Sequence, residues 1–108
     1  MRLFFYGTLL DPALLRRLTG RPAMLQPAVL HGFRRVRLRG TPYPTLAPGR
    51  GTVFGALYVA DRAALRRLNA YEGPRYRLWR VRPRVAGRRD PVEARTWIAR
   101  GATRQPWP

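Results

Sequence analysis

The sequence predicts a single small α+β domain, in which a curved, mainly antiparallel sheet or small mixed barrel is flanked by two short helices. Five segments have strand-like hydrophobic patterns, and only two have helical ones. Most links between the strands are too short for the helical crossover that parallel neighbours need. The chain has 108 residues, 45% of them hydrophobic, which suits one domain with one continuous interior. Helices at the sides of such a sheet define the α+β class.

The first predicted elements are a strand and a helix. Residues 3–6 are apolar and precede Gly7, as in a buried strand that ends at a turn. Asp11 followed by Pro12 predicts the start of a helix, because Asp is a favoured N-cap and Pro fits the first helical position. Gly20 is expected to end this helix.

The middle of the chain predicts two more strands. In residues 28–39, apolar side chains alternate with arginines, the two-residue period of a half-buried strand. Residues 40–45 contain two prolines and are expected to form a loop or a strand edge, because proline has no N–H to donate. Residues 48–51 predict a turn, and residues 52–60 form the third predicted strand.

Asp61 predicts the N-cap of a second helix, which Gly73 and Pro74 should stop. Residues 76–85 and 92–99 predict the last two strands, joined by a turn at 86–91. We therefore expect residues 1–100 to form the domain. Residues 101–108 are expected to be a poorly ordered C-terminal tail.

The composition excludes several classes of protein. The chain contains no cysteine, which excludes disulfide frameworks, thiolate zinc sites and cysteine nucleophiles. No apolar run approaches the roughly 20 residues of a membrane span, and the N-terminal run is too short for a secretory signal. The expected location is the cytoplasm, without membrane association.

The formal net charge of +17 comes from 22 basic and 5 acidic residues, and every basic residue is arginine. Such a charge raises the possibility of nucleic-acid binding. The complete absence of lysine points instead to compositional bias, although bias does not explain why acids are so few. We expect weak binding of polyanions without sequence preference, and nucleic-acid binding as a main function stays an alternative.

The chain has few acidic residues, so few carboxyl groups are candidates for a catalytic role. Asp11 and Asp61 have roles as N-caps, Asp90 lies in a predicted turn, and Glu93 is expected to be solvated near the start of the last strand. Only Glu72 lacks a structural role. Its position alone leaves two readings open, an exposed charge beyond a helix end and a functional carboxylate.

The sequence gives little support for a catalytic triad, a metal site or a nucleotide-binding site. The chain has one histidine, His31, which is expected to be an ordinary strand residue, and no serine for a Ser-His-Asp triad. One histidine and five scattered acids do not suggest a metal site. Glycine-rich nucleotide motifs are absent from the sequence, so no cofactor is expected.

Residues Tyr6, Gly7, Thr8 and Leu9 connect the first strand to the first helix. Backbone N–H groups at such a corner can bind a carboxylate or an oxyanion. The same corner is also common as plain structure, so both readings stay open.

The combination of motifs resembles the gamma-glutamylcyclotransferase-like superfamily, in particular its gamma-glutamylamine cyclotransferase-like proteins. The order and spacing of three segments agree with the family across residues 3–98. These are Phe4-Phe5-Tyr6-Gly7-Thr8-Leu9, then Tyr43-Pro44-Thr45-Leu46 with Val53-Phe54-Gly55-Ala56-Leu57-Tyr58, and Leu68-Asn69-Ala70-Tyr71-Glu72-Gly73 through Tyr76 and Val81.

The resemblance implies a small mixed barrel with an active-site cavity. It implies that Glu72 is the general acid/base and that residues 6–9 form the substrate-binding loop. Tyr76 is also expected to bind substrate and to help enclose Glu72. The sequence departs from the family pattern at Asn69, where an aspartate is common, and at Leu78, where an arginine is usual.

The chemistry that the resemblance implies needs few groups. A gamma-glutamyl amide carries its own nucleophile, the α-amino group, whose attack on the γ-carbonyl forms 5-oxoproline and releases an amine. No enzyme nucleophile, metal or cofactor is required, and one carboxylate can move the proton. The alternative is a catalytically silent binding module of the same fold that uses its arginine-rich surface to associate with nucleic acid.

Overall fold

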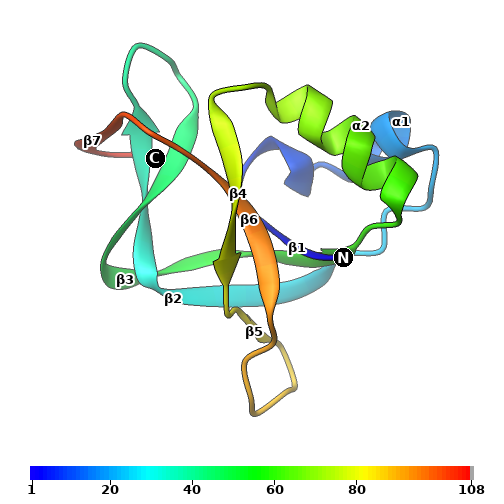
Figure 1. Cartoon of the computed structure of the whole chain (residues 1–108). Coiled ribbons are helices and arrows are strands. Elements are labelled where there is room, and N and C mark those ends of the chain that lie inside the picture. Colours follow the sequence, from blue (N-terminus) through cyan, green and yellow to red (C-terminus); the bar gives the residue numbers. More distant parts are fainter. Residues whose placement is uncertain (108) are drawn as a thin grey trace.

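The structure is a computed structural model that describes residues 1–107. The elements in chain order are β1 (Arg2–Phe5), η1 (Thr8–Leu10), α1 (Pro12–Thr19), β2 (Gln26–Leu38), β3 (Pro44–Val59), α2 (Arg62–Glu72), β4 (Tyr76–Val81), β5 (Arg84–Val85), β6 (Ala94–Ala99) and β7 (Ala102–Pro106). The sheet has the order β4-β6-β1-β3-β2-β5, and β7 pairs with β2. Its only parallel pair among the described residues is β1 with β6. The predicted α+β class is confirmed, with the sheet curled into a half-barrel (Figure 1).

Both helices begin as predicted. The Asp11 carboxylate accepts a hydrogen bond from the N–H of Ala13, and the Asp61 carboxylate accepts one from Ala64 at 2.7 Å. α1 ends at Gly20, which adopts a left-handed conformation with φ +68°. The two helices pack against each other on one side of the sheet (Figure 1).

Strands β2 and β3 form a long hairpin, whose register shifts between His31 and Phe33. Residues 48–51 do not form the predicted turn. They lie within β3, at the point where this register shift occurs. Among residues 1–107, the first part of β3, from Pro44, pairs with β2 alone. The predicted strand edge at residues 40–45 is therefore found at the end of that segment. Proline is tolerated there because one side of the strand has no ladder.

The second half of the chain corrects two further predictions. The predicted strand at 76–85 is broken at Arg82 and Pro83, and its parts pair with different strands: β4 with β6, and β5 with β2. Pro83 supplies a reason for the break, because it has no N–H for a ladder. β6 begins at Ala94, two residues later than predicted.

The predicted tail is also wrong for most of its length. Residues 102–106 form β7, which pairs with β2 through Val36 and Leu38. Trp107 follows it and donates its backbone N–H to the carbonyl of Arg35. The last residue of the predicted tail, Pro108, lies outside the described residues.

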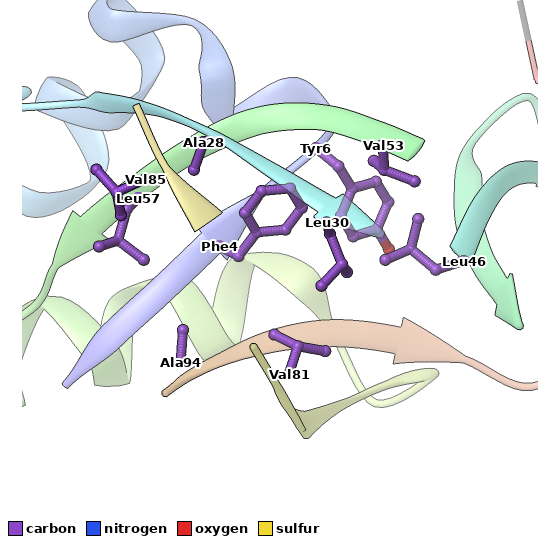
Figure 2. Packing of buried hydrophobic residues seen from close by; sticks show 10 residues of the cluster. All are labelled: Phe4, Tyr6, Ala28, Leu30, Leu46, Val53, Leu57, Val81, Val85 and Ala94. Carbon is purple, nitrogen blue, oxygen red and sulfur yellow. The ribbon is translucent and has the colours of Figure 1, made fainter. Parts of the chain in front are cut away.

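Two hydrophobic clusters pack on opposite sides of β1. Phe4 and Tyr6 belong to one cluster, in which they lie among side chains from β2, β3 and β6 (Figure 2). Leu3 and Phe5 belong to the other, together with residues of both helices. This alternation places the chain that follows β1 beside both clusters.

Gly55 permits β3 to approach its neighbour β1 closely. A Cβ atom at this position would lie 2.0 Å from the carbonyl oxygen of Phe5, so no larger residue fits without moving the backbone. The packing of β3 against β1 therefore explains why a glycine is needed in the middle of the family-like segment Val53–Tyr58.

Among the described residues, no helix is long and apolar enough to cross a membrane.

Candidate active site

A cavity of about 250 Å³ opens where β1 ends and α2 ends. Its walls come from the β1–α1 connection, the start of β3, the end of α2, and β4 and β6. The lining residues are Phe4, Phe5, Tyr6, Gly7, Thr8, Leu9, Tyr43, Pro44, Tyr71, Glu72, Tyr76, Thr96 and Trp97. Glu72 is the one acidic or basic side chain in this lining, although the chain carries 22 arginines.

Glu72 is the last residue of α2. Gly73 follows with φ +85° and ψ 176°, a conformation that side chains other than glycine strongly disfavour. The helix therefore stops at the residue that carries the carboxyl, and the chain turns away immediately. This geometry presents Glu72 to the cavity at the helix end.

Burial raises the pKa of Glu72 from 4.5 to about 7. Loss of hydration is the cause, because it penalises the charged form of a carboxyl group. A carboxyl with a pKa near neutrality can both accept and return a proton at physiological pH.

Tyr6 is anchored at both its side chain and its backbone. Its phenol hydroxyl donates a hydrogen bond to the carbonyl of Trp97, and burial raises the pKa of this phenol far above its usual range. The guanidinium of Arg35 donates to the Tyr6 carbonyl oxygen at 3.2 Å. The hydroxyl proton of Tyr6 is thus engaged within the protein, and the loop after it starts from a fixed point.

The opposite end of the loop contacts the end of α2. The hydroxyl groups of Thr8 and Tyr71 form a hydrogen bond of 3.0 Å. Tyr71 immediately precedes Glu72, so this bond joins the predicted substrate-binding loop to the helix end that carries the carboxyl. Both side chains are exposed, which places the bond at the mouth of the cavity.

Tyr76 closes another side of the cavity. Its hydroxyl donates to the carbonyl of Pro44 at 2.9 Å, which ties β4 to the start of β3. Burial, followed by the charge of Glu72, raises the pKa of Tyr76 to about 12. The phenol and the carboxyl line the same cavity.

The cavity gathers every site residue that the sequence predicts: Tyr6, Gly7, Thr8, Leu9, Glu72 and Tyr76. The predicted rise in the pKa of Glu72 is also found. The catalytic and substrate-binding roles of these residues remain predictions.

Sequence reasoning missed several walls of the cavity. Tyr43 and Pro44 carried a signal, since they lie in a family-like segment, and Tyr71 adjoins Glu72 in sequence. Thr96 and Trp97 had no signal, because they reach the cavity through the parallel pairing of β6 with β1.

His31 lies in β2 as predicted, exposed to solvent and hydrogen-bonded to Thr52 at 3.0 Å. Within residues 1–107, no three His, Cys, Asp or Glu side chains come close enough together to hold a metal ion.

A family model described as gamma-glutamyl cyclotransferase, AIG2-like, matches residues 3–107. The chain belongs to this family. As a member of the AIG2-like gamma-glutamyl cyclotransferases, it resembles Protein AIG2 C of Arabidopsis thaliana, with 40% identity over 76 residues that cover 68% of this chain and 46% of the relative. The chain spans about half the length of the curated relatives it matches.

Solved structures with a related fold also match the chain. A solution structure of a protein from Arabidopsis thaliana matches with a TM-score of 0.81 and 31% identity, covering 91% of this chain and 61% of that one. A solved gamma-glutamyl cyclotransferase matches with a TM-score of 0.82 over 95% of this chain and 68% of that one. Its identity is only 16%, so this second likeness concerns the fold.

Proposed function

We propose that this AIG2-like chain cyclises a gamma-glutamyl amine or a related amide, releasing 5-oxoproline and an amine, with Glu72 as the general acid/base. The observation that carries the proposal is a carboxyl group with a pKa of about 7 in a cavity that also contains the Tyr6–Leu9 loop. The family's gamma-glutamyl cyclotransferase character supports the reaction class.

The proposed reaction forms one C–N bond and breaks another. Ionised Glu72 takes a proton from the α-ammonium group of the substrate, and the freed amine attacks the γ-carbonyl carbon. The tetrahedral intermediate then collapses as protonated Glu72 gives its proton to the leaving nitrogen and the bond to that nitrogen breaks. Ionised Glu72 then passes the second proton of the attacking nitrogen to the released amine, which leaves as an ammonium ion. The carboxyl ends in its starting state, so one group serves both steps.

The remaining walls would orient the substrate. Backbone N–H groups of the Tyr6–Leu9 loop are suited to hold the anionic end of the substrate or the developing oxyanion, the latter contributing about 3 kcal/mol per donor. The aromatic walls exclude water and hold the glutamyl chain in a bent conformer, which brings its amine close to its own γ-carbonyl.

The test compares wild type with Glu72→Gln across a panel of gamma-glutamyl amines, measuring released 5-oxoproline. The substitution keeps the volume and removes the base, so we expect turnover to fall at least about 100-fold. Glu93→Gln is the matched control, because Glu93 is exposed and does not line the cavity. Equal rates for wild type and Glu72→Gln would refute the role of Glu72. A wild type inactive on every amine would instead favour the silent binding module.

A separate observation favours weak association with polyanions. Among the side chains that the structure describes, one ion pair is present, between Arg21 and Asp61 at 3.0 Å. Nearly all of the arginine charge is therefore uncompensated by protein carboxylates and available to phosphate groups.

A further inference from the structure

Arg35 lies behind the loop that the proposed reaction uses. It is a half-buried residue of β2, and its guanidinium donates a hydrogen bond to the carbonyl oxygen of Tyr6. That carbonyl belongs to the same peptide group as the N–H of Gly7, and both residues line the cavity. A donor on the carbonyl polarises the peptide group and makes its N–H a stronger donor to an anion.

The position of Arg35 is fixed from its other side by the C-terminal segment. The Arg35 guanidinium carbon lies 5.5 Å from the centre of the Trp107 ring, a cation–π arrangement. The Trp107 backbone N–H bonds to the Arg35 carbonyl, and its indole N–H bonds to the carbonyl of Pro42. Pro42 directly precedes Tyr43 and Pro44, which line the cavity, so Trp107 braces two parts of the wall at once.

The charge of Arg35 is also uncompensated. Of the side chains that the structure describes, only Arg21 forms an ion pair with a carboxylate. A half-buried cation without a counter-ion favours a negative charge close by, because the interior screens it less than water does. The Tyr6–Gly7 peptide is the direct route from this cation to the cavity.

We propose that Arg35 is a positioning residue that makes the cavity selective for a ligand with a carboxylate, acting through the Tyr6–Gly7 peptide and braced by Trp107. The ligand class is an amino-acid derivative with a free α-carboxylate, as opposed to one whose carboxyl is masked as an amide. This inference rests on the proposed function for its choice of ligand.

The Glu72 carboxyl and the Arg35 guanidinium act on different parts of the cavity. Burial alone accounts for the raised pKa of Glu72, and no arginine lowers it. Arg35 can therefore attract a carboxylate without holding Glu72 in its ionised form. A substrate with an anion at one end and a proton to transfer at the other matches this separation.

The experiment measures binding rather than turnover, using 5-oxoproline and its neutral amide as paired probes in an NMR titration of the Gly7 and Thr8 amide signals. We expect wild type to prefer the carboxylate about tenfold. Arg35→Met should remove this preference and leave affinity for the neutral amide unchanged. Arg35→Lys should restore part of the preference, because it keeps the charge but loses the planar guanidinium that stacks on Trp107.

Arg34→Met is the matched control for net charge, since Arg34 is the exposed neighbour of Arg35 on β2. The inference is overturned if Arg35→Met keeps the preference, if Arg34→Met loses it equally, or if wild type shows none. Thermal unfolding of each variant guards against a misfolded Arg35→Met, and Trp107→Phe, which keeps an aromatic ring over the guanidinium, should retain the preference.

Turnover measured in parallel separates this inference from the reaction. A chain that releases no 5-oxoproline from any amine, yet shows a carboxylate preference that depends on Arg35, supports the role of Arg35 and contradicts the cyclotransferase. A chain that turns over its substrate, with an unchanged carboxylate preference in Arg35→Met, supports the cyclotransferase and contradicts the role of Arg35.

Discussion

The indole N–H of Trp97 donates a hydrogen bond of 3.0 Å to the side-chain oxygen of Asn69, joining β6 to the last turn of α2. Asn69 lies three residues before Glu72, so this bond holds the part of the helix that carries the carboxyl. An aspartate, common at this position in the family, would offer the same acceptor. The departure at Asn69 therefore preserves the contact.

Replacing this acceptor should loosen the end of α2. Asn69→Ala leaves the N–H of buried Trp97 without its partner, and we expect the free energy of unfolding to fall by about 1 kcal/mol. Asn69→Asp should stay close to wild type. Urea unfolding of both variants measures the difference. Equal losses for the two substitutions would show that the hydrogen bond does not stabilise the helix end.

The raised pKa of Glu72 predicts an unusual dependence of stability on pH. The folded chain holds the Glu72 proton more tightly than the unfolded chain, whose pKa is near 4.5. Between about pH 4.5 and 7 the folded state binds more protons, so the free energy of unfolding should decrease as pH rises through this window. At one pKa unit per 1.36 kcal/mol, the loss is at most about 3 kcal/mol.

Glu72→Gln removes this titration and supplies the control. The difference in unfolding free energy between the variant and wild type should grow in favour of the variant from pH 4.5 to 7. Urea unfolding across this range measures it. A difference that stays constant with pH would show that the Glu72 carboxyl is hydrated.

The proposed catalytic rate should change with pH in the opposite direction. The ionised carboxylate is the form that accepts the substrate proton, so kcat/KM should rise with pH through about 7. Steady-state assays between pH 5 and 8 on an accepted gamma-glutamyl amine test this expectation. A kcat/KM that does not change between pH 5 and 8 would contradict a catalytic Glu72 with a pKa near 7.

Gly73 predicts a local effect on the site. Its φ of +85° with ψ 176° is a backbone conformation that residues with a side chain adopt only at a cost in free energy. This cost is not steric crowding by neighbours, because a Cβ atom at Gly73 would meet no other atom within 4 Å. Gly73→Val should lower the free energy of unfolding by about 1–3 kcal/mol and displace Glu72, reducing turnover. Gly87→Val is the control, because Gly87 also has a positive φ, +81°, but does not adjoin a residue that lines the cavity. Its turnover should be unchanged once folding is complete. If both variants lose activity equally, the conformation of Gly73 has no special effect on Glu72.

The arginine surface predicts weak, salt-sensitive binding of nucleic acid. Counterion release should make affinity for duplex DNA fall steeply between about 50 and 200 mM salt, without preference between sequences. Fluorescence anisotropy with two unrelated duplexes measures both properties. Nanomolar binding that persists at about 0.2 M salt would instead support nucleic acid as a main partner.

Local signals explain which parts of the fold could be predicted. Asp11 and Asp61 mark helix starts because capping involves only the next few residues. β7 could not be predicted, since its pairing with Val36 joins residues about 70 positions apart and its own sequence is polar. Pro48, Gly49 and Gly51 suit a turn as well as a bulged strand, and only pairing with β2 decides between them.

The residues of the cavity also fall into two groups, those that local sequence signals reveal and those that only the pairing of distant strands brings together. Glu72 could be selected as a candidate because few acids exist in the chain, and the resemblance of the segment around it to the family indicated its role. Its neighbours Thr96 and Trp97 could not, because no sequence pattern reveals that β6 runs parallel to β1. Arg35 is one of 22 arginines, and its contacts with Tyr6 and Trp107, which are distant in sequence, distinguish it.

The two-sided packing of β1 has a consequence for how this protein can change during evolution. The loop that begins at Tyr6 directly continues a strand clamped by both hydrophobic clusters, with Phe4 in one and Phe5 in the other. A substitution that shifts either cluster also shifts the start of that loop. New ligand preferences should therefore arise more readily at the rim, through exposed residues such as Tyr43 and Tyr71, than through changes beneath the loop.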